Sequence, residues 1–291
     1  PFIDLQSAAV LADTWDTTPQ DLLICTHQKV GTHLAKKFLV ELLQRGYELP
    51  PQHPCRNGDI GHAAVPWPEV FLSQQGQQAW HGFEASTGLA PRLWYVHCSY
   101  DDLPVRRVHP ATRFVLVVRD PKAVAVSQYH FWQKHPLLGV DAGLELEDFV
   151  DLFLSNKLYF GNYHGHVLNW LERPDQRVNA AQLCVLFYED MVQDKLATAQ
   201  QLQTFLPGCA ALDQAQLEAL AQATGFDAMK QEMTTNPRSF HLNPSVYFRA
   251  GTVDSWRQEL SEAAATRIDA ATQQVWGGSR HASTLSRYLA G

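Results

Sequence analysis

The hydrophobic positions of the chain gather in four short runs separated by polar segments. Three of the four are apolar almost without alternation, which is typical of parallel strands covered on both faces. We therefore expect buried strands in these runs, which are Asp21–Thr26, Arg92–His97, Arg113–Arg119 and Gln182–Tyr188.

Helical periodicity follows three of these runs. After the first, five apolar residues fall on one helical face before Gly46 (Leu34, Phe38, Leu39, Leu42 and Leu43). After the third, Pro121 suits the first turn of a helix that runs to about His135. After the fourth, residues 189–206 have the pattern of one helix that ends before Pro207. Further helices are predicted at Glu145–Lys157, Tyr163–Glu172, Leu212–Thr224 and Ser261–Val275.

Strands that alternate with helices predict an α/β fold, with a central, mainly parallel sheet flanked by helices. Residues 1–291 show no internal repeat and no linker-like change in composition, so we expect a single domain. The segment Thr234–Ser255 has no clear period. It is long for a connection without structure, and such loops are often functional.

Charge and cysteine content exclude several classes of protein. The formal net charge of −7 argues against a nucleic-acid-binding protein, which usually carries a basic excess. The five cysteines are odd in number and form no C-x-x-C pair, so neither a disulfide framework nor a familiar zinc site is expected. No apolar run could span a bilayer, and the first residues lack a basic signal-peptide region. We expect a cytoplasmic protein that does not associate with a membrane. Whether the first residues were trimmed stays open.

Polar side chains follow the carboxyl ends of the predicted strands, where open α/β sheets bind ligands. The first of these segments, His27–Thr32, has the outline of a phosphate-binding loop and predicts a P-loop-like, nucleotide-binding topology. A Walker A loop places Lys directly after Gly, whereas here Lys29 precedes Gly31. Gly31 would still let the backbone approach an anion at the helix N-terminus. An ordinary turn with a solvated Lys explains the loop equally well.

The segment Arg119–Trp132 offers a second anion contact. Arg119 ends a predicted strand, and Ser127 lies about two helical turns beyond Pro121. Arginine is well suited to bidentate phosphate binding. The alternative is an Arg119 paired with Asp120 or another carboxylate.

Taken together, these segments resemble the cytosolic-type sulfotransferases, which take a sulfuryl group from 3′-phosphoadenosine 5′-phosphosulfate (PAPS) and release 3′-phosphoadenosine 5′-phosphate (PAP). The residues "HQKVGTHL" are similar to the family's Y-P-K-S-G-T-T-W, and "RDPKAVAVSQYHF" to its R-N-P-K-D-V-A-V-S-Y-Y-H-F. "FRAGTVDSW" is similar to F-R-K-G-x-x-G-D-W, and "LFYEDM" and "ATGFDAMK" also look like family segments. The ordered matches extend from about residue 21 to 260.

The resemblance implies a PAPS site built from separate segments. The loop would hold the 5′-phosphosulfate with Lys29, Val30, Gly31, Thr32, His33 and Leu34. Arg119 and Ser127 would hold the 3′-phosphate, and Arg249, Ala250 and Gly251 would close over it. Tyr188, Thr224 and Phe226 match positions that contact the adenine. The stretch after Thr234 would be a mobile flap.

The resemblance also implies a catalytic pair. His97 follows the second strand where the family has a K-T-H pattern, and it would take the proton of the acceptor. Lys29 would stabilise the leaving oxygen during an in-line transfer. No metal is expected. His164 and His166 are two residues apart, but they lie in a predicted helix without a third ligand, so we interpret them as non-metal residues.

Five departures from the family pattern could weaken PAPS binding: Gln28, Val30, Leu34, Tyr95 and Ala250. Tyr95 and Ala250 stand where the family has lysines, and Lys122 or Arg238 could compensate.

The acceptor is expected to be a small molecule that is sulfated on a hydroxyl or amine. The segments Arg56–Trp67 and His97–Asp102 and the aromatic residues around Tyr129–Trp132 and Tyr159–Tyr163 could line its pocket, although most of the aromatic residues could equally belong to the core. Asp59, Asp101 and Asp102 could instead favour a cationic acceptor, or be ordinary surface residues. The alternatives are a P-loop nucleotide or small-molecule kinase, a non-catalytic nucleotide-binding module, and an enzyme that modifies peptide tyrosine. The oligomeric state stays open.

Overall fold

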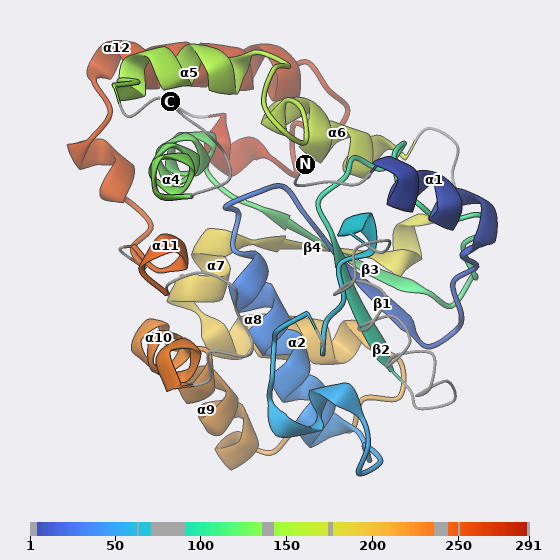
Figure 1. The fold of residues 1–291 in the computed structure, drawn as a ribbon. Coiled ribbons are helices and arrows are strands. Elements are labelled where there is room, and N and C mark those ends of the chain that lie inside the picture. Colours follow the sequence, from blue (N-terminus) through green and yellow to red (C-terminus); the bar gives the residue numbers. More distant parts are fainter. Residues whose placement is uncertain are drawn as a thin grey trace.

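A four-stranded parallel sheet forms the centre of the computed structural model (Figure 1). The structure describes residues 5–62, 64–70, 91–135, 143–173, 177–235, 244–249 and 251–289. The strands lie in the order β2-β1-β3-β4, and all neighbouring pairs are parallel. Their bounds are β1 Asp21–Thr26, β2 Arg92–Val96, β3 Arg113–Val118 and β4 Leu183–Phe187. All four predicted strands are confirmed to within a residue at each end.

Continuous burial explains why these runs become strands. Every residue of β1 and β2 is buried, and in β3 only Arg113 is partly exposed. Such strands need cover on both faces. Figure 1 shows α2, α8 and α9 on one side of the sheet and α4, α5, α6 and α12 on the other. The predicted α/β fold, a mainly parallel sheet flanked by helices, is confirmed.

The predicted helices are present except in one place, and the helices Leu5–Thr14, Phe226–Thr235 and Pro244–Tyr247 were not predicted. Their bounds are α1 Leu5–Thr14, α2 Thr32–Gly46, α4 Pro121–Lys134, α5 Leu146–Leu154, α6 Tyr163–Glu172, α7 Tyr188–Gln193, α8 Lys195–Phe205, α9 Gln214–Ala223, α10 Phe226–Thr235, α11 Pro244–Tyr247 and α12 Glu262–Thr272. Short helical turns lie at η1 Pro54–Asn57, η2 Pro68–Val70, η3 Ala180–Gln182, η5 Ser255–Gln258, η6 Gln273–Gly277 and η7 Ser286–Tyr288.

The single helix predicted over residues 189–206 is wrong. Asp194 leaves helical geometry, and its carboxylate accepts a hydrogen bond from the Ala197 amide at 2.9 Å, so it caps a new helix. The chain therefore forms α7 and then α8. The break turns α8 against β4 and α9, while α7 keeps Tyr188 at the carboxyl edge of the sheet.

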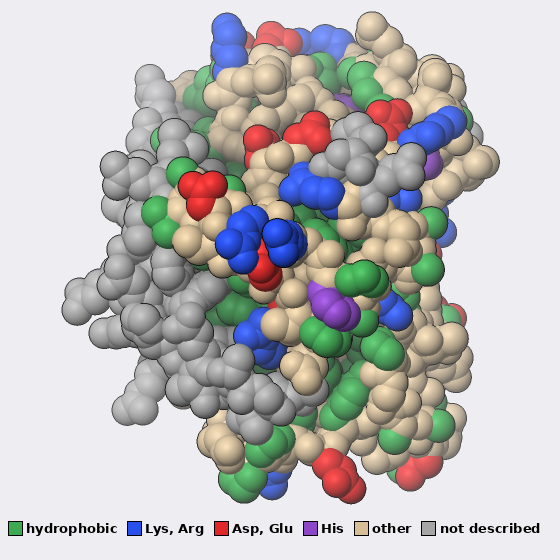
Figure 2. Space-filling view, turned by 90° about the vertical axis from the view of Figure 1, so that its right-hand side faces the viewer, with side chains coloured by type: hydrophobic (Ala, Val, Ile, Leu, Met, Phe, Trp, Pro, Cys, Tyr) green, Lys and Arg blue, Asp and Glu red, His purple; other side chains and the backbone are tan. Residues whose placement is uncertain are grey.

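Charged side chains of both signs are mixed on one face of the molecule (Figure 2). On the face shown in Figure 2, Lys and Arg side chains lie next to Asp and Glu side chains, without a continuous basic area among the described residues. Within the described ranges, no helix combines the length and the apolar character needed to cross a bilayer.

Candidate active site

The loop between β1 and α2 is shaped by two residues with left-handed backbones. Gly31 has φ 110° and caps α2, and Lys29 has φ 67°. A Cβ atom on Gly31 would lie 2.5 Å from Cδ2 of Tyr188, so the aromatic ring packs directly on the glycine. A helix N-terminus reached through a glycine is suited to hold a phosphate. The predicted loop residues and Tyr188 are thus brought together.

Two of the loop's departures from the family pattern point into the protein. Val30 is completely buried in the core. Gln28 is buried too; its side-chain oxygen accepts a hydrogen bond from Nε1 of Trp132 at 3.2 Å. Gln28 thus anchors the loop to α4, and both side chains point into the protein.

Arg119 follows β3 and reaches back to the same loop. One guanidinium nitrogen donates to the Lys29 carbonyl at 2.8 Å, and the guanidinium lies 4.1 Å from the centre of the Tyr188 ring. The backbone of Arg119 is held by the Tyr163 hydroxyl, which accepts from the amide and donates to the carbonyl. Nε of Arg119 is buried without a hydrogen-bond partner among the described residues. A buried donor of this kind is able to donate a hydrogen bond to an anion.

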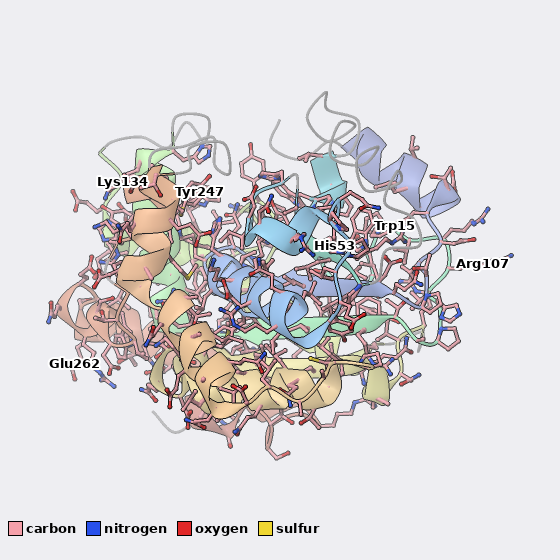
Figure 3. All side chains as sticks on the ribbon, turned by 90° about the horizontal axis from the view of Figure 1, so that it is seen from below. Trp15, His53, Arg107, Lys134, Tyr247 and Glu262 are labelled. Carbon is pink, nitrogen blue, oxygen red and sulfur yellow. The ribbon has the colours of Figure 1, made fainter. Side chains whose placement is uncertain are left out.

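Positive charges converge on the Lys29 ammonium, which lies 4.5 Å from the centre of the Phe131 ring. Burial lowers the pKa of Lys29 to about 7, and repulsion from Arg119, Arg249 and Lys134 adds to the effect. These cations come from segments far apart in the sequence. Figure 3 shows Lys134 on the same side of the molecule as Tyr247, away from Trp15 and Arg107. A bound anion would relieve this repulsion.

Arg249 is held close to α4 by an acidic residue that the sequence did not reveal. Its guanidinium pairs with Glu259 and donates to the Ser255 hydroxyl at 2.9 Å. The Glu259 carboxylate also pairs with His130 of α4. Ser127 lies one turn before His130 on α4 and is partly exposed. The predicted 3′-phosphate residues therefore gather around α4, with Glu259 as a competing anion.

The predicted adenine residues do not form one cluster: Tyr188 packs on Gly31, whereas Phe226 begins α10. A Cβ atom on Gly251 (φ 66°) would lie 2.3 Å from the Phe226 ring, and Phe226 contacts Phe248 with ring centres 5.5 Å apart. Thr224, by contrast, is buried and uses its hydroxyl within α9, donating to the Leu220 carbonyl at 3.0 Å. Ala250 lies outside the described residues.

The remaining loop positions, His33 and Leu34, lie on the first turn of α2. The His33 ring contacts Tyr247 of α11, with ring centres 4.9 Å apart. Leu34 is partly buried against the core.

His97 lies just beyond β2 with its ring orientation fixed. Its Nδ1 lies 2.8 Å from the Thr26 carbonyl, which can only accept, so Nδ1 carries the proton and Nε2 keeps a free lone pair. Thr26 also receives a hydrogen bond from Thr32 of the loop at 3.0 Å. Burial, together with the charges of His27 and Lys36, lowers the pKa of His97 to about 3. The imidazole is therefore neutral near pH 7, as a proton acceptor must be.

The buried carboxyl group of Glu69 holds the backbone of His97. One of its oxygens accepts the amides of His97 at 2.6 Å and of Cys98 at 2.9 Å. Burial raises the pKa of Glu69 to about 7 against the opposing effect of these hydrogen bonds. Glu69 gave no signal in the sequence, since it sits in a 3₁₀ turn without periodicity.

The rings of Trp67, Tyr95 and Phe160 contact His97. Trp67 and Tyr95 stack with ring centres 5.6 Å apart, and Phe160 lies 5.2 Å from the His97 ring. Two other residues that were predicted to line the pocket do not contact His97. Tyr163 is buried in the core, and Tyr129 packs on Phe149. The aromatic wall around His97 is suited to a flat, apolar acceptor.

Several other sequence-based candidates lie away from this chemistry. Lys122 pairs with Asp269, so it is already neutralised and does not replace a missing lysine; Arg238 lies outside the described residues. His164 is hydrogen-bonded to Thr272 at 2.8 Å, and His166 is buried in α6. Over the described ranges, no group of three or more His, Cys, Asp or Glu side chains is arranged for a metal ion.

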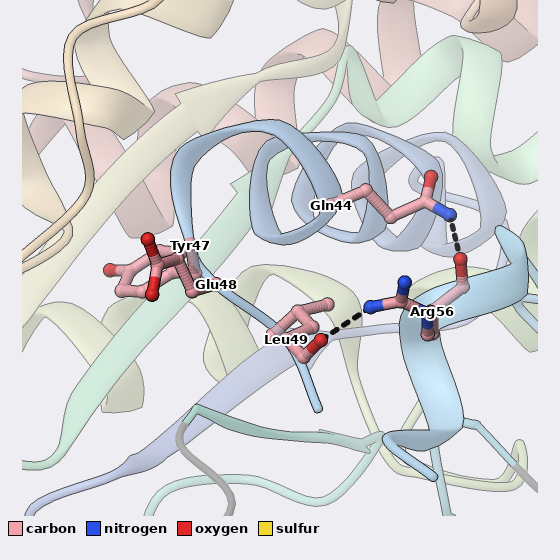
Figure 4. Close-up of a pocket in the computed structure, with 5 residues that line it drawn as sticks. All are labelled: Gln44, Tyr47, Glu48, Leu49 and Arg56. Atoms are coloured by element: carbon pink, nitrogen blue, oxygen red, sulfur yellow. Dashed lines mark hydrogen bonds between the residues drawn. The ribbon is translucent and has the colours of Figure 1, made fainter. Parts of the chain in front are cut away.

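A surface hollow lies at the other end of α2. Figure 4 shows that it is lined by Gln44, Tyr47, Glu48, Leu49 and Arg56. Gln44 donates to the Arg56 carbonyl, and Arg56 donates to the Leu49 carbonyl, both at 2.5 Å. These groups satisfy one another, and the hollow is separated from Gly31 by the length of the helix. It is not part of the candidate site.

Comparison with known proteins identifies the family of the chain. The family model described as "Sulfotransferase domain" matches residues 19–280. Human sulfotransferase 1C2 is 28% identical over 277 residues, which cover 91% of this chain and 87% of that protein. Rat sulfotransferase 1C2 is 29% identical over 272 residues, with 91% and 86% covered.

A solved structure shares the fold. The crystal structure of mouse sulfotransferase SULT7A1 complexed with PAP has a TM-score of 0.73 at 21% identity, covering 99% of this chain and 96% of that one. At 21% identity this structural likeness shows only the fold. The family is shown by the family model, which matches most of the chain. The chain therefore belongs to the sulfotransferase domain family.

Proposed function

We propose that the protein is a PAPS-dependent sulfotransferase that moves a sulfuryl group to a hydroxyl or amine of a small molecule and releases PAP. The observation that carries the proposal is the position of the Arg119 guanidinium, which donates to the Lys29 carbonyl at 2.8 Å beside Gly31 at the N-terminus of α2. An anion of high charge would offset the positive charges of Lys29 and Arg119, and PAPS carries phosphate groups on both the 3′ and the 5′ oxygen of its ribose.

The residues present fit the two phosphate ends of PAPS. The 5′ end would lie on the amides of Gly31 and Thr32 beside Lys29. The 3′-phosphate would take the unpartnered Nε of Arg119, with Ser127 and Arg249 at its other side. The adenine would lie near Phe226 and Tyr188. Bound PAPS supplies the activated sulfuryl group.

The protein's own residues would move one proton and stabilise charge. With Nδ1–H fixed on the Thr26 carbonyl, Nε2 of His97 would accept the proton of the acceptor hydroxyl or amine. Negative charge brought by the donor would raise the pKa of His97 from its low value in the free protein and make it a stronger base. Lys29 would stabilise the negative charge on the leaving phosphate oxygen.

The acceptor class follows from the walls around His97. Trp67, Tyr95 and Phe160 offer flat apolar surfaces, so we propose a planar, largely apolar molecule. Two structural neighbours at 18% and 19% identity are retinol dehydratase in complex with androsterone and with retinol, which are molecules of this general kind.

Ligand binding tests the proposal directly. A ligand that binds only the folded state raises the unfolding temperature by mass action. PAP should therefore stabilise the protein with or without Mg²⁺, and PAPS with a panel of phenols, alcohols and amines should yield a sulfated product. Stabilisation by ATP with Mg²⁺ but not by PAP would overturn the proposal in favour of a kinase.

The hydrogen bond between the Lys122 amide and Asp120 argues against the kinase alternative. A kinase of this topology needs a carboxylate at a strand end for Mg²⁺. Asp120, which follows β3, instead caps α4 by accepting the Lys122 amide at 2.8 Å.

A further inference from the structure

Two neighbouring lysines of α2 are both buried, but only one of them is neutralised. Lys37 lies 2.9 Å from a Glu41 oxygen and 2.7 Å from a Glu232 oxygen. Lys36 is 2% exposed and makes no ion pair with any described residue. Its ammonium lies 3.4 Å from the centre of the Tyr95 ring and 3.5 Å from the Ile60 carbonyl oxygen. A buried ammonium with such weak partners is costly to the fold.

Lys36 faces the candidate site. It lies one helical turn beyond Thr32 and His33, on the side of α2 that carries the loop. Tyr95, which it contacts, lies two residues before His97 on β2, and the two rings are 5.4 Å apart. The positive charge of Lys36 lowers the pKa of both His33 and His97. The ammonium thus lies near both the loop and the proposed base.

The Lys36 ammonium lies beside a position where the resemblance predicts a different lysine. Tyr95 stands where the resemblance predicts a lysine, and this departure removes a positive charge from β2. Lys36 brings a positive charge onto the ring of the same residue, from the neighbouring helix. Burial lowers its pKa well below the ordinary value, opposed by Asp59, so a nearby anion would favour its charged form.

We infer that Lys36 is a further catalytic residue, which donates a hydrogen bond to a non-bridging oxygen of the sulfuryl group and stabilises its charge during transfer. This inference rests on the proposed function. In the step, the bond between sulfur and the 5′-phosphate oxygen breaks, and its electron pair stays on that oxygen. The acceptor oxygen or nitrogen forms the new bond to sulfur, and its proton goes to His97. Lys36 keeps its protons throughout.

The test compares Lys36→Met with Lys37→Met as a matched control. The dissociation constants of PAPS and PAP are measured by calorimetry without acceptor, and kcat is measured with an acceptor that the wild type uses. Lys36→Met should bind PAP within about twofold of wild type, since PAP has no sulfuryl group. It should lose about tenfold in PAPS affinity relative to PAP and about 10²–10³-fold in kcat. Lys37→Met should keep the PAPS-to-PAP ratio and kcat.

Two results would overturn the inference. One is a Lys36→Met protein with wild-type kcat and an unchanged PAPS-to-PAP ratio. The other is an equal loss of PAPS and PAP binding, which would assign Lys36 to the fold or to the 5′-phosphate. Should Lys36→Met not fold, Lys36→Gln gives the same comparison. A wild type that neither binds PAP nor transfers sulfate would refute the proposed function itself, which distinguishes the two failures.

Discussion

Raising the pH above neutral should weaken PAP binding through the titration of Lys29. In the free protein, burial and the surrounding cations lower the pKa of Lys29 to about 7. A phosphate on the adjacent loop would raise this pKa, so binding takes up a proton. The favourable contribution is complete below the pKa of the free protein and is lost as the pH rises above it.

The size of the effect follows from the fraction of Lys29 that is protonated. With a pKa of about 7, this fraction falls from about one half at pH 7 to about one tenth at pH 8. The dissociation constant of PAP should therefore rise about fivefold over this interval and about tenfold over the next pH unit. The second ionisation of a phosphate group, near pH 6, acts in the opposite direction and is almost complete by pH 7.

Calorimetric titration of PAP at constant ionic strength measures this dependence. Lys29→Arg is the matched control, because a guanidinium stays charged over the whole range. Its dissociation constant should change less than about twofold between pH 7 and 8. A wild-type affinity that is flat across this interval, or the same slope in Lys29→Arg, would refute the role of Lys29 as the titrating cation.

Three other substitutions probe separate parts of the site. His97→Ala should lower kcat by about 10²–10⁴-fold while the thermal shift with PAP is kept. Glu259→Gln removes the anion that pairs with Arg249 and should tighten PAP binding about threefold to tenfold in calorimetry. Gly31→Ala should destabilise the protein by about 1–3 kcal/mol in denaturant unfolding and abolish the PAP shift, since its Cβ would meet Tyr188.

Two control variants make the same substitutions away from the site, so they should leave PAP binding unchanged. Gly165→Ala places a Cβ atom within α6 at 3.8 Å from Oδ1 of Asn162, an ordinary van der Waals distance, and should leave PAP binding unchanged. Glu262→Gln removes an exposed charge at the start of α12 and should not tighten binding. Full activity in His97→Ala, unchanged affinity in Glu259→Gln, or a normal PAP shift in Gly31→Ala would each contradict the corresponding assignment.

The sheet could be predicted from the sequence because parallel strands covered on both faces leave continuous apolar runs. The break between α7 and α8 was missed because the apolar pattern continues across it. Its signal was Asp194, a residue type that often caps helices, but a single Asp within a helical pattern also fits a solvated position. The capping bond to Ala197 decides between the two.

The loop and His97 were found through their sequence patterns, whereas Lys36 and Glu259 were not. A lysine within an amphipathic helix is ordinarily interpreted as solvent-exposed. Lys36 is buried only because the segment around Ile60 and the strand with Tyr95 pack over it. Glu259 depends likewise on the arrangement that brings α4 beside the segment with Arg249. Tertiary packing creates both features, so no local pattern could reveal them.

The loop's departures from the family pattern acquire different meanings once their directions are known. Val30 and Gln28 point into the core and fix the loop, so they leave the anion-binding side of Gly31 intact. Leu34 stands where the resemblance predicts a Trp near the adenine, and Phe226, held between Gly251 and Phe248, is kept as a proposed aromatic contact there. A departure in a binding motif therefore weakens a functional assignment only where the replaced side chain faces the ligand.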